Sequence, residues 1–210
     1  QVLNSGRLVR ADTALADALH RRTCTSPTIV DVAQGVSIIG SPPVLYVVVG
    51  TAALWCALRR LGRLAVFLVA TCLLGGVVDT VVKVVVDRAR PALEGCHVVA
   101  HGKSFPSGHA MSSTVAYGAL LLVFLPLLAP RLRPWAISAA VALVLLIGLA
   151  RQALGVHYLS DVLGGYVLGL AWLALATAAF EIWRSDRGSR RSHPLAEGLE
   201  PEDQRQLRRN

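Results

Sequence analysis

The chain has 210 residues, of which 54% are hydrophobic and only 16% are charged. With a mean hydropathy of +0.54 it is too apolar for an ordinary soluble domain, so it is expected to be a membrane protein. The net charge of +8 does not indicate a nucleic-acid partner, because the cations stand between apolar runs and in a polar tail, without a basic face among aromatic residues.

Five segments are long and apolar enough, or nearly so, to cross a bilayer as helices, for which about 20 residues are needed. The first and fourth are short, and residues 36–41 can extend the first. No strand-like alternation accompanies them. The sequence therefore predicts an all-α fold, a polytopic membrane helical bundle. In chain order the segments are residues 43–58, 64–82, 110–129, 135–150 and 162–183.

Lysines and arginines in the short loops predict the orientation, since they favour the cytoplasmic side. Three basic stretches, residues 59–63, 131–133 and 184–191, fall on one side if all five segments span. Residues 87–107 and 151–160 then face outward, together with the N-terminal stretch. An outer N terminus with five spans predicts a further span before Gln1, which makes six in the full-length protein.

This reading divides the chain into three parts. Residues 1–35 form an extracytoplasmic N-terminal segment, and residues 36–183 form the membrane-embedded domain. Residues 184–210 mix both charge signs with proline and glycine, so they are expected to form a partly disordered cytoplasmic tail.

Three polar clusters fall on the predicted outer side. Lys83-x6-Arg90-Pro91 ends the second apolar segment, and Phe105-Pro-Ser-Gly-His109 begins the third. Arg151-x5-His157-x3-Asp161 joins the fourth to the fifth. Cations and histidines that meet at one membrane depth from separate segments are typical of an anion site.

The residue types suit a phosphoryl group in particular. Its charge in transfer is spread over three oxygens, which preorganised cations stabilise. Lys83, Arg90 and Arg151 supply three cations, and arginine can bind two oxygens at once. Ser107 and Gly108 precede a predicted helix, so their backbone N–H groups can also point at an anion.

The histidines supply the chemistry. His157 and Asp161 are four residues apart, which puts them on one face if the stretch is helical. A carboxylate that accepts the Nδ1 proton leaves Nε2 free to attack phosphorus. His109, from another segment, can protonate the leaving oxygen and then activate water. No ring of carboxylates is available for Mg²⁺ or Zn²⁺, so no metal is predicted.

These clusters together resemble the signature of the type 2 phosphatidic acid phosphatase (PAP2) superfamily, bacterial lipid phosphatase branch: K-x6-R-P, P-S-G-H and S-R-x5-H-x3-D. Every spacing agrees, and Ala150 replaces the usual serine before Arg151. The resemblance implies a helical bundle in the plasma or inner membrane. It also implies hydrolysis of phosphate monoesters or pyrophosphates without a cofactor, through a phosphohistidine at His157. The expected partners are the bilayer and a lipid phosphate, such as phosphatidic acid, phosphatidylglycerol phosphate or a polyprenyl (di)phosphate.

Three alternatives stay open at this stage. A lipid-linked phosphotransferase would share the phosphohistidine step. A non-catalytic transporter or scaffold could retain an anion site, although the intact His109, His157 and Asp161 argue against it. A soluble vanadate-dependent haloperoxidase would share the clamp, but five apolar segments argue against it.

Other polar residues are interpreted without a catalytic role. Asp79 lies four residues before Lys83, so we predict a structural ion pair. Arg88 is expected to touch a lipid headgroup or face water. The four remaining histidines are expected at the surface or the rim of the site: His20, His97, His101 and His193.

The four cysteines show no metal-binding spacing. Cys24 and Cys96 both fall on the predicted outer side, where a disulfide is chemically permitted. We predict that they pair. Cys56 and Cys72 lie within apolar segments and are expected to be small core residues.

Overall fold

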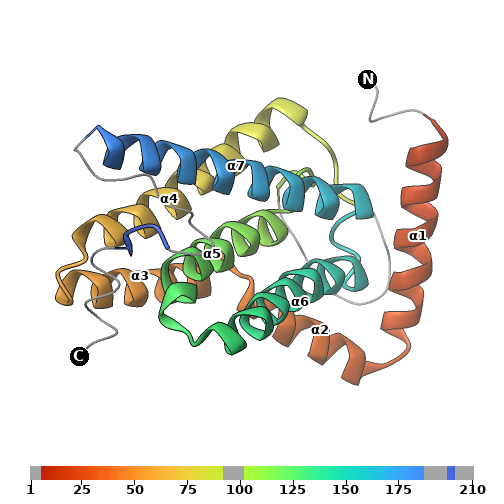
Figure 1. The fold of residues 1–210 in the computed structure, drawn as a ribbon. Helices are drawn as coiled ribbons and strands as arrows, with labels where there is room; N and C mark the ends of the chain where they lie inside the picture. The colour runs from red at the N-terminus through yellow and green to blue at the C-terminus, as the bar shows by residue number, and fades with distance from the viewer. Residues whose placement is uncertain (1–5, 92–101, 187–197, 202–210) are drawn as a thin grey trace.

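In a computed structural model of the chain, the described residues are 6–91, 102–186 and 198–201. They form a helical bundle without strands in these ranges (Figure 1). The α-helices are α1 (Arg7–Cys24), α2 (Pro27–Ile39), α3 (Pro42–Leu58), α4 (Gly62–Val86), α5 (Gly108–Phe124), α6 (Arg133–Ala153) and α7 (Leu159–Ser185), and two short 3-10 helices, η1 (Leu125–Leu127) and η2 (Pro130–Leu132), link α5 to α6.

The predicted membrane spans are confirmed. Four helical stretches within the described residues are long and apolar enough to cross a bilayer: Gly62–Val86, Gly108–Leu127, Pro130–Ala153 and Leu159–Ser185. Helices α2 and α3 together pass the same test as one span bent by 41°. The bend follows from the sequence between them, because Gly40 ends α2 and Pro42 begins α3 in the first turn, where the N–H that proline lacks would have no partner within the helix.

Helix α5 is the centre of the bundle. It packs against α3, α4, α6 and α7, and its contact with α7 is the most extensive. Two glycines on α7 make that contact close. An added Cβ at Gly165 would come within 2.7 Å of the Ser107 carbonyl oxygen, and one at Gly169 within 2.8 Å of Thr114 Cβ. The small residues let the two backbones approach, as is common between membrane helices.

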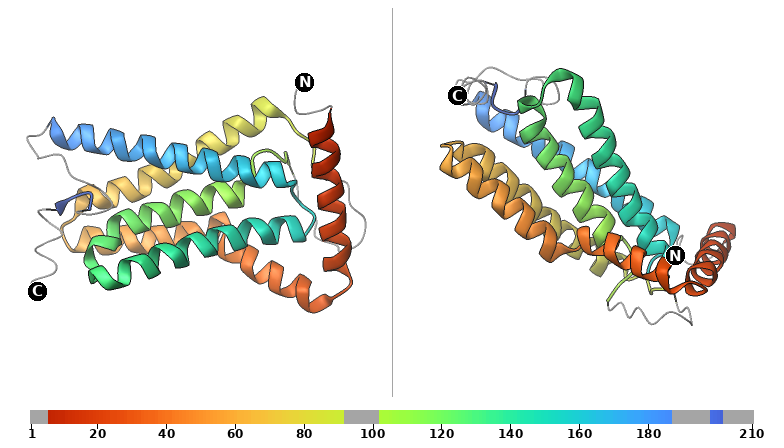
Figure 2. Two further views of the ribbon diagram at one scale, coloured as in Figure 1. Left: turned by 45° about the vertical axis from the view of Figure 1, so that its right-hand side comes forward. Right: turned by 90° about the horizontal axis from the view of Figure 1, so that it is seen from below.

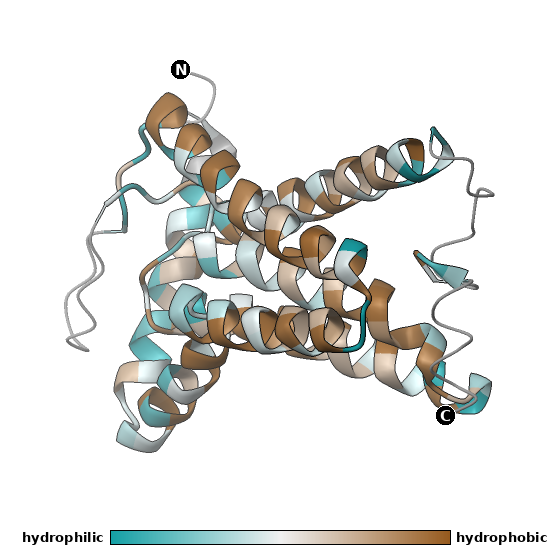
Figure 3. Cartoon of the chain, turned by 90° about the vertical axis from the view of Figure 1, so that its left-hand side faces the viewer, coloured by the Kyte–Doolittle hydropathy of each residue, from teal (hydrophilic) through white to brown (hydrophobic). Residues whose placement is uncertain are grey.

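The outer surface of the bundle is apolar. Large side chains such as Val66, Val85 and Val167 are more than half exposed, which suits contact with lipid chains rather than water. Figure 3 shows apolar residues along the bundle helices and polar residues gathered toward the two ends.

Helix α1 does not run with the bundle. It lies across one end, where α4 finishes, α5 begins, and α6 connects to α7 (Figures 1 and 2). It contacts α2, α6 and α7 there. The described parts of the N-terminal segment and of the two predicted outer loops therefore share one end of the molecule.

Candidate active site

The three polar clusters meet at the end of the bundle that α1 covers. The backbone N–H of Ser107 donates to the Asp161 carbonyl at 2.9 Å, which ties the start of α5 to the start of α7. The Lys83 ammonium reaches Gly108 from α4, so closely that an added Cβ at Gly108 would lie 2.8 Å from Nζ. Glycine thus leaves room for the ammonium to approach the chain at this point.

His157 lies in the turn before α7 and is 2% exposed. Arg90 Nη1 lies 3.1 Å from its Nε2 and donates to the Val156 carbonyl at 2.8 Å. Because a guanidinium only donates, Nε2 is the acceptor, and the neutral ring carries its proton on Nδ1. Burial and, after it, the charges of Arg90 and Arg151 lower the His157 pKa to about 4, against the opposing effect of Asp161. The nucleophilic nitrogen is therefore unprotonated at neutral pH.

Asp161 is fully buried in the first turn of α7 and faces the other side of the ring. Its Oδ2 lies 3.6 Å from His157 Nδ1, slightly beyond an ordinary hydrogen bond. The same oxygen accepts from the Ser104 hydroxyl and, at 2.9 Å, from the Tyr158 backbone N–H. Arg88 Nη1 donates to Oδ1 at 2.7 Å. The carboxylate is thus held from several directions.

The three predicted cations lie at this end of the bundle, Arg90 and Arg151 near His157 and Lys83 near His109, each with its own anchor. Lys83 pairs with Asp79, which confirms the predicted ion pair. Arg151 is 9% exposed and donates to the Ser37 hydroxyl of α2 at 2.8 Å. Arg90 Nε donates to the Gly102 carbonyl at 3.1 Å, and burial lowers its pKa although Asp161 raises it. Arg90 is still a cation at neutral pH, because a guanidinium keeps its proton in proteins.

His109 and Ser107 complete the site from the start of α5. His109 is half-buried and lies within the electrostatic range of Lys83, Arg90 and Arg151, as well as of His157. The Ser107 hydroxyl is buried and has no hydrogen-bond partner among the described residues. A buried donor of this kind is costly unless a ligand completes it.

All eight residues predicted for the site thus come together at one end of the bundle. Within the described ranges, no group of three or more His, Cys, Asp or Glu side chains is arranged to hold a metal ion. Metal independence and the assigned roles stay predictions.

Two expectations from the sequence are wrong. Arg88 neither faces water nor is open to a lipid headgroup, because its side chain is only 8% exposed and binds Asp12, Ser160 and Asp161. His20 is not a surface residue, because it is 3% exposed and its ring packs against Gly155. Both errors have one cause. Helix α1 folds over the end of the bundle, and no local sequence pattern predicts that position.

Ser104 and Asp12 were not singled out in the sequence, although both support the site. Ser104 is fully buried and donates to Asp161, and its position just before the Phe105–His109 cluster was the only available signal. Asp12 gave no signal, because it is an ordinary acid on a mixed polar helix.

The cysteine predictions have different outcomes. Cys56 is buried and Cys72 is half-buried, and both are free, as predicted. Cys24 is disulfide-bonded. Cys96 lies outside the described residues, so its pairing with Cys24 stays a prediction. His97, His101 and His193 also lie outside them.

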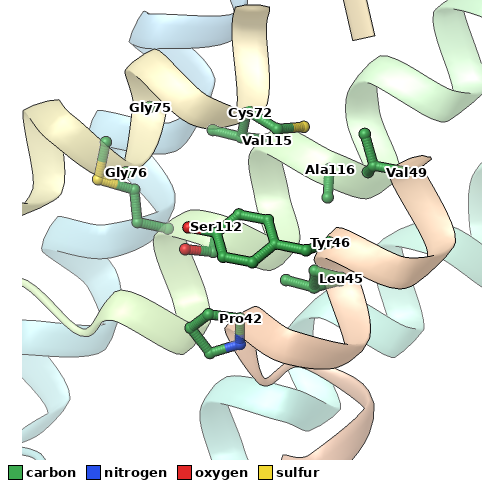
Figure 4. A pocket seen from close by; sticks show the side chains of 11 residues that line it. Pro42, Leu45, Tyr46, Val49, Cys72, Gly75, Gly76, Ser112, Val115 and Ala116 are labelled. Atoms are coloured by element: carbon green, nitrogen blue, oxygen red, sulfur yellow. The ribbon is translucent and has the colours of Figure 1, made fainter. Parts of the chain in front are cut away.

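A narrow groove opens between α3, α4 and α5 (Figure 4). Pro42 and Tyr46 line it from α3, Gly75 and Gly76 from α4, and Ser112 from α5. Ser112 follows His109 by one helical turn, so the groove begins beside the site and continues toward the middle of the bundle.

Comparisons with known proteins show which family this chain resembles in sequence. The profile of the PAP2 superfamily matches residues 63–184. Phosphatidylglycerophosphatase B of Bacillus subtilis (strain 168) is 39% identical over 95 residues, which is 44% of this chain and 46% of that protein. Lipid A 1-phosphatase of Rhizobium johnstonii is 31% identical over 125 residues, or 53% of this chain and 46% of that protein. The chain thus matches about half the length of these relatives.

The fold has a solved counterpart. The crystal structure of a transmembrane PAP2 type phosphatidylglycerolphosphate phosphatase from Bacillus subtilis matches with a TM-score of 0.77. The match covers 91% of this chain and 92% of that one, at 24% sequence identity. At this identity the likeness establishes the shared bundle fold.

Proposed function

The chain belongs to the PAP2 superfamily, and from this membership we propose that it hydrolyses a lipid phosphate monoester or diphosphate in the membrane. One observation carries the proposal: His157 is buried at the point where three separated segments deliver Arg90, Arg151 and the Ser107–His109 turn. This arrangement joins a neutral nucleophile to a cationic clamp. Its relatives, named for acting on phosphatidylglycerophosphate and lipid A, support a lipid as substrate.

The reaction begins when a phosphoryl group enters the clamp. Its oxygens take hydrogen bonds from Lys83, Arg90 and Arg151, and the Arg90 bond to Nε2 is given up in exchange. The Ser107 hydroxyl and the Gly108 N–H donate to the same oxygens. Because Nε2 is unprotonated, its lone pair is then free to attack phosphorus.

Transfer occurs in two steps. A bond forms between Nε2 and phosphorus as the bond to the lipid oxygen breaks. His109, which takes up a proton once the anionic substrate offsets the charges of the clamp, gives that proton to the leaving oxygen. Asp161 stabilises the positive charge that develops on the ring of His157. His109, now neutral, takes a proton from water as that water attacks the phosphohistidine. Inorganic phosphate leaves, and both histidines return to their starting states.

We further propose that this end of the bundle faces the extracytoplasmic side of a plasma or inner membrane. The basic stretches at residues 59–63 and 131–133 lie at the opposite end of the helices and support that orientation. Residues 1–35 then lie outside, residues 36–183 form the membrane-embedded catalytic domain, and residues 184–210 form a cytoplasmic tail.

The test is phosphate release in detergent from phosphatidic acid, phosphatidylglycerol phosphate, and a polyprenyl phosphate and diphosphate. We expect the wild type to release phosphate from at least one of them, and to do so after EDTA treatment. The variant His157→Ala should lose at least about 10³-fold in kcat, as nucleophile deletions do. Lys103→Ala, which removes an exposed cation near the same end, is the matched control and should keep activity.

Three outcomes contradict the proposal. These are no release from any substrate, equal activity in His157→Ala, and loss of activity with EDTA that added metal restores. Phosphate found on an acceptor other than water, without free phosphate, would favour a phosphotransferase.

A further inference from the structure

A second buried charge cluster lies behind Asp161, on the side away from His157. At its centre is Arg88, whose Nη1 donates to Asp161 Oδ1 at 2.7 Å and to the Ser160 hydroxyl at 2.5 Å. Its Nη2 donates to Asp12 Oδ2 at 2.9 Å. The guanidinium also lies over the Tyr158 ring, 4.2 Å from the centroid. One cation therefore bridges two carboxylates from different elements.

Asp12 is the contribution of α1 to this cluster. Its side chain is 9% exposed, and its Oδ1 accepts the Ser160 backbone N–H at 3.1 Å. The Ser160 hydroxyl donates to its other oxygen. Ser160 is in the first turn of α7, where N–H groups have no partner within the helix. Asp12 thus caps α7 from another helix and binds Arg88 with the same carboxylate.

Both carboxylates of the cluster depend on Arg88 to compensate their negative charge. Asp161 is fully buried and Asp12 nearly so, and two buried negative charges close together repel. Arg88 compensates both, and its planar fork reaches the two carboxylates simultaneously. A lysine at this position would keep the charge but could not span both partners with the same geometry.

The orientation of the Asp161 carboxylate depends on which of its two oxygens each hydrogen-bond partner holds. Arg88 holds Oδ1 of Asp161, so Oδ2 is the oxygen left to face His157 Nδ1, where Ser104 and the Tyr158 N–H fix it. A rotation of the carboxylate would break the bond to Arg88. The direction of Asp161 therefore depends on a residue that does not touch the substrate.

We infer that Arg88 is a positioning residue for the reaction, and that Asp12 ties α1 to the nucleophile through it. The inference rests on the proposed phosphohistidine chemistry, since it assigns a role through Asp161 and His157. It gives α1 a function beyond covering the end of the bundle: the helix supplies half of the anchor that orients the His157–Asp161 pair.

The experiment is a double-mutant cycle with Asp12→Asn, Arg88→Gln and both together, in detergent, on the substrate that the wild type hydrolyses best. We expect Arg88→Gln to lower kcat by about 100-fold, as small misplacements of catalytic groups do, with little change in KM. Asp12→Asn should lower kcat by about tenfold, the equivalent of one charge-assisted hydrogen bond. The double variant should be no worse than Arg88→Gln, because Asp12 acts through Arg88. Arg88→Lys should fall between the wild type and Arg88→Gln.

A pH profile separates positioning from a merely structural role. The charged or titratable groups facing His157 are Asp161, Arg90, Arg151 and His109. Loss of Arg88 leaves the Asp161 charge uncompensated, which favours the protonated ring. The acid limb of kcat/KM, which reports the free enzyme, should therefore move to higher pH, by about one unit. Asp17→Asn, on the same helix and without a hydrogen bond or ion pair in the described ranges, is the matched control and should leave kcat and the acid limb unchanged.

The inference is overturned if the kcat losses of Asp12→Asn and Arg88→Gln multiply in the double variant, or if the acid limb stays in place. Size-exclusion profiles and Tm in detergent identify variants that do not fold. Should Arg88→Gln be one of them, Asp12→Asn and Arg88→Lys are judged by the same shift of the acid limb.

Binding of orthovanadate, which mimics phosphate in transfer, supplies a readout that needs no turnover. Binding that weakens in Arg88→Gln would support the inference even if the wild type released no phosphate, whereas unchanged binding would contradict it.

Discussion

At the residue scale, the central feature is one histidine held between a cation and a carboxylate. Arg90 donates to Nε2 of His157, and Asp161 lies beside Nδ1. The first contact fixes the tautomer in the free protein, and the second stabilises the ring once Nε2 is bonded to phosphorus. The same geometry thus serves both halves of the proposed reaction.

The pH dependence of kcat/KM tests this arrangement, because it reports the groups of the free enzyme. Burial and the nearby arginines lower the His157 pKa to about 4, and the nucleophile must be neutral. Since histidine loses its proton as pH rises through its pKa, the nucleophile is competent from about pH 4 upward. We expect the acid limb of kcat/KM that belongs to His157 to lie well below pH 6.5, the ordinary histidine value.

Two substrates separate this limb from ionisation of the substrate itself. A phosphate monoester and a diphosphate differ in their own pKa values, so a limb that moves between them belongs to the substrate. A limb near pH 6.5 that is common to both would contradict the buried, neutral His157.

The sequence predicted the members of the site but not their supports. Within each of the three motifs, such as Lys83–Arg90 or His157–Asp161, the residues lie at short separations along the chain, so each motif can be recognised from the sequence alone. Arg88 and Asp12 are 76 residues apart and meet only because α1 folds across the bundle. Their pairing depends on a tertiary contact, which no spacing rule encodes.

At the element scale, the spans were predictable because lipid requires long apolar helices with every backbone group satisfied internally. Most predicted limits fell at or a few residues inside the observed ends, as for residues 135–150 against α6 (Arg133–Ala153), whereas the predicted segment 110–129 ran past the end of α5 at Phe124. The helices extend beyond the apolar core to polar residues such as Arg151. The course of α1 was not predictable, because a mixed polar helix is compatible with several positions at a membrane surface.

The contact between α5 and α7 determines how the histidine segments meet. An added Cβ at Gly165 would lie 2.7 Å from the Ser107 carbonyl oxygen and 3.1 Å from the Met111 backbone nitrogen. Backbone atoms cannot rotate away as a side chain can. Gly165→Ala should therefore separate the two helices and destabilise the protein by about 1–3 kcal/mol, as overpacked cores do. Activity should fall with it, because Ser107 and Asp161 are joined across this contact.

Gly50→Ala is the matched control for that substitution. Gly50 is in the interior of α3, and an added Cβ there would meet nothing within 4 Å. Alanine should keep or raise Tm at this position, because it favours the helix. Thermal unfolding in detergent measures both variants. Equal Tm values for the two would show that the close approach of α5 and α7 does not limit stability.

At the scale of the whole molecule, the two ends of the bundle differ in kind. The site end carries α1 and the two catalytic-site histidines with their charged partners, and the opposite end carries aromatic residues beside arginines. Arg59 lies 5.6 Å from the Trp55 ring centroid, and Arg63 lies 5.7 Å from that of Trp183. Tryptophan with arginine is typical of the boundary between lipid chains and headgroups. This end therefore marks one interface of the membrane.

The tail also contributes at that end, in the short part that is described. Leu199 is fully buried and belongs to the main apolar core with Leu64 and Phe180. Arg63 lies 3.6 Å from Glu200, which is almost fully buried. Residues 198–201 thus pack onto the bundle although the sequence around them is polar and charged.

Labelling of single engineered cysteines tests the proposed orientation of the two ends. Lys103 lies at the site end with 49% of its side chain exposed, and Arg131 is exposed in η2 at the opposite end. If the site faces outward, Lys103→Cys should react with a membrane-impermeant maleimide in intact cells, whereas Arg131→Cys should react only after permeabilisation. The unsubstituted chain gives the background from Cys56 and Cys72, which should be small because both lie within the bundle. Reaction of both variants from the same side would refute an odd number of spans between them, and reversed labelling would place the site in the cytoplasm.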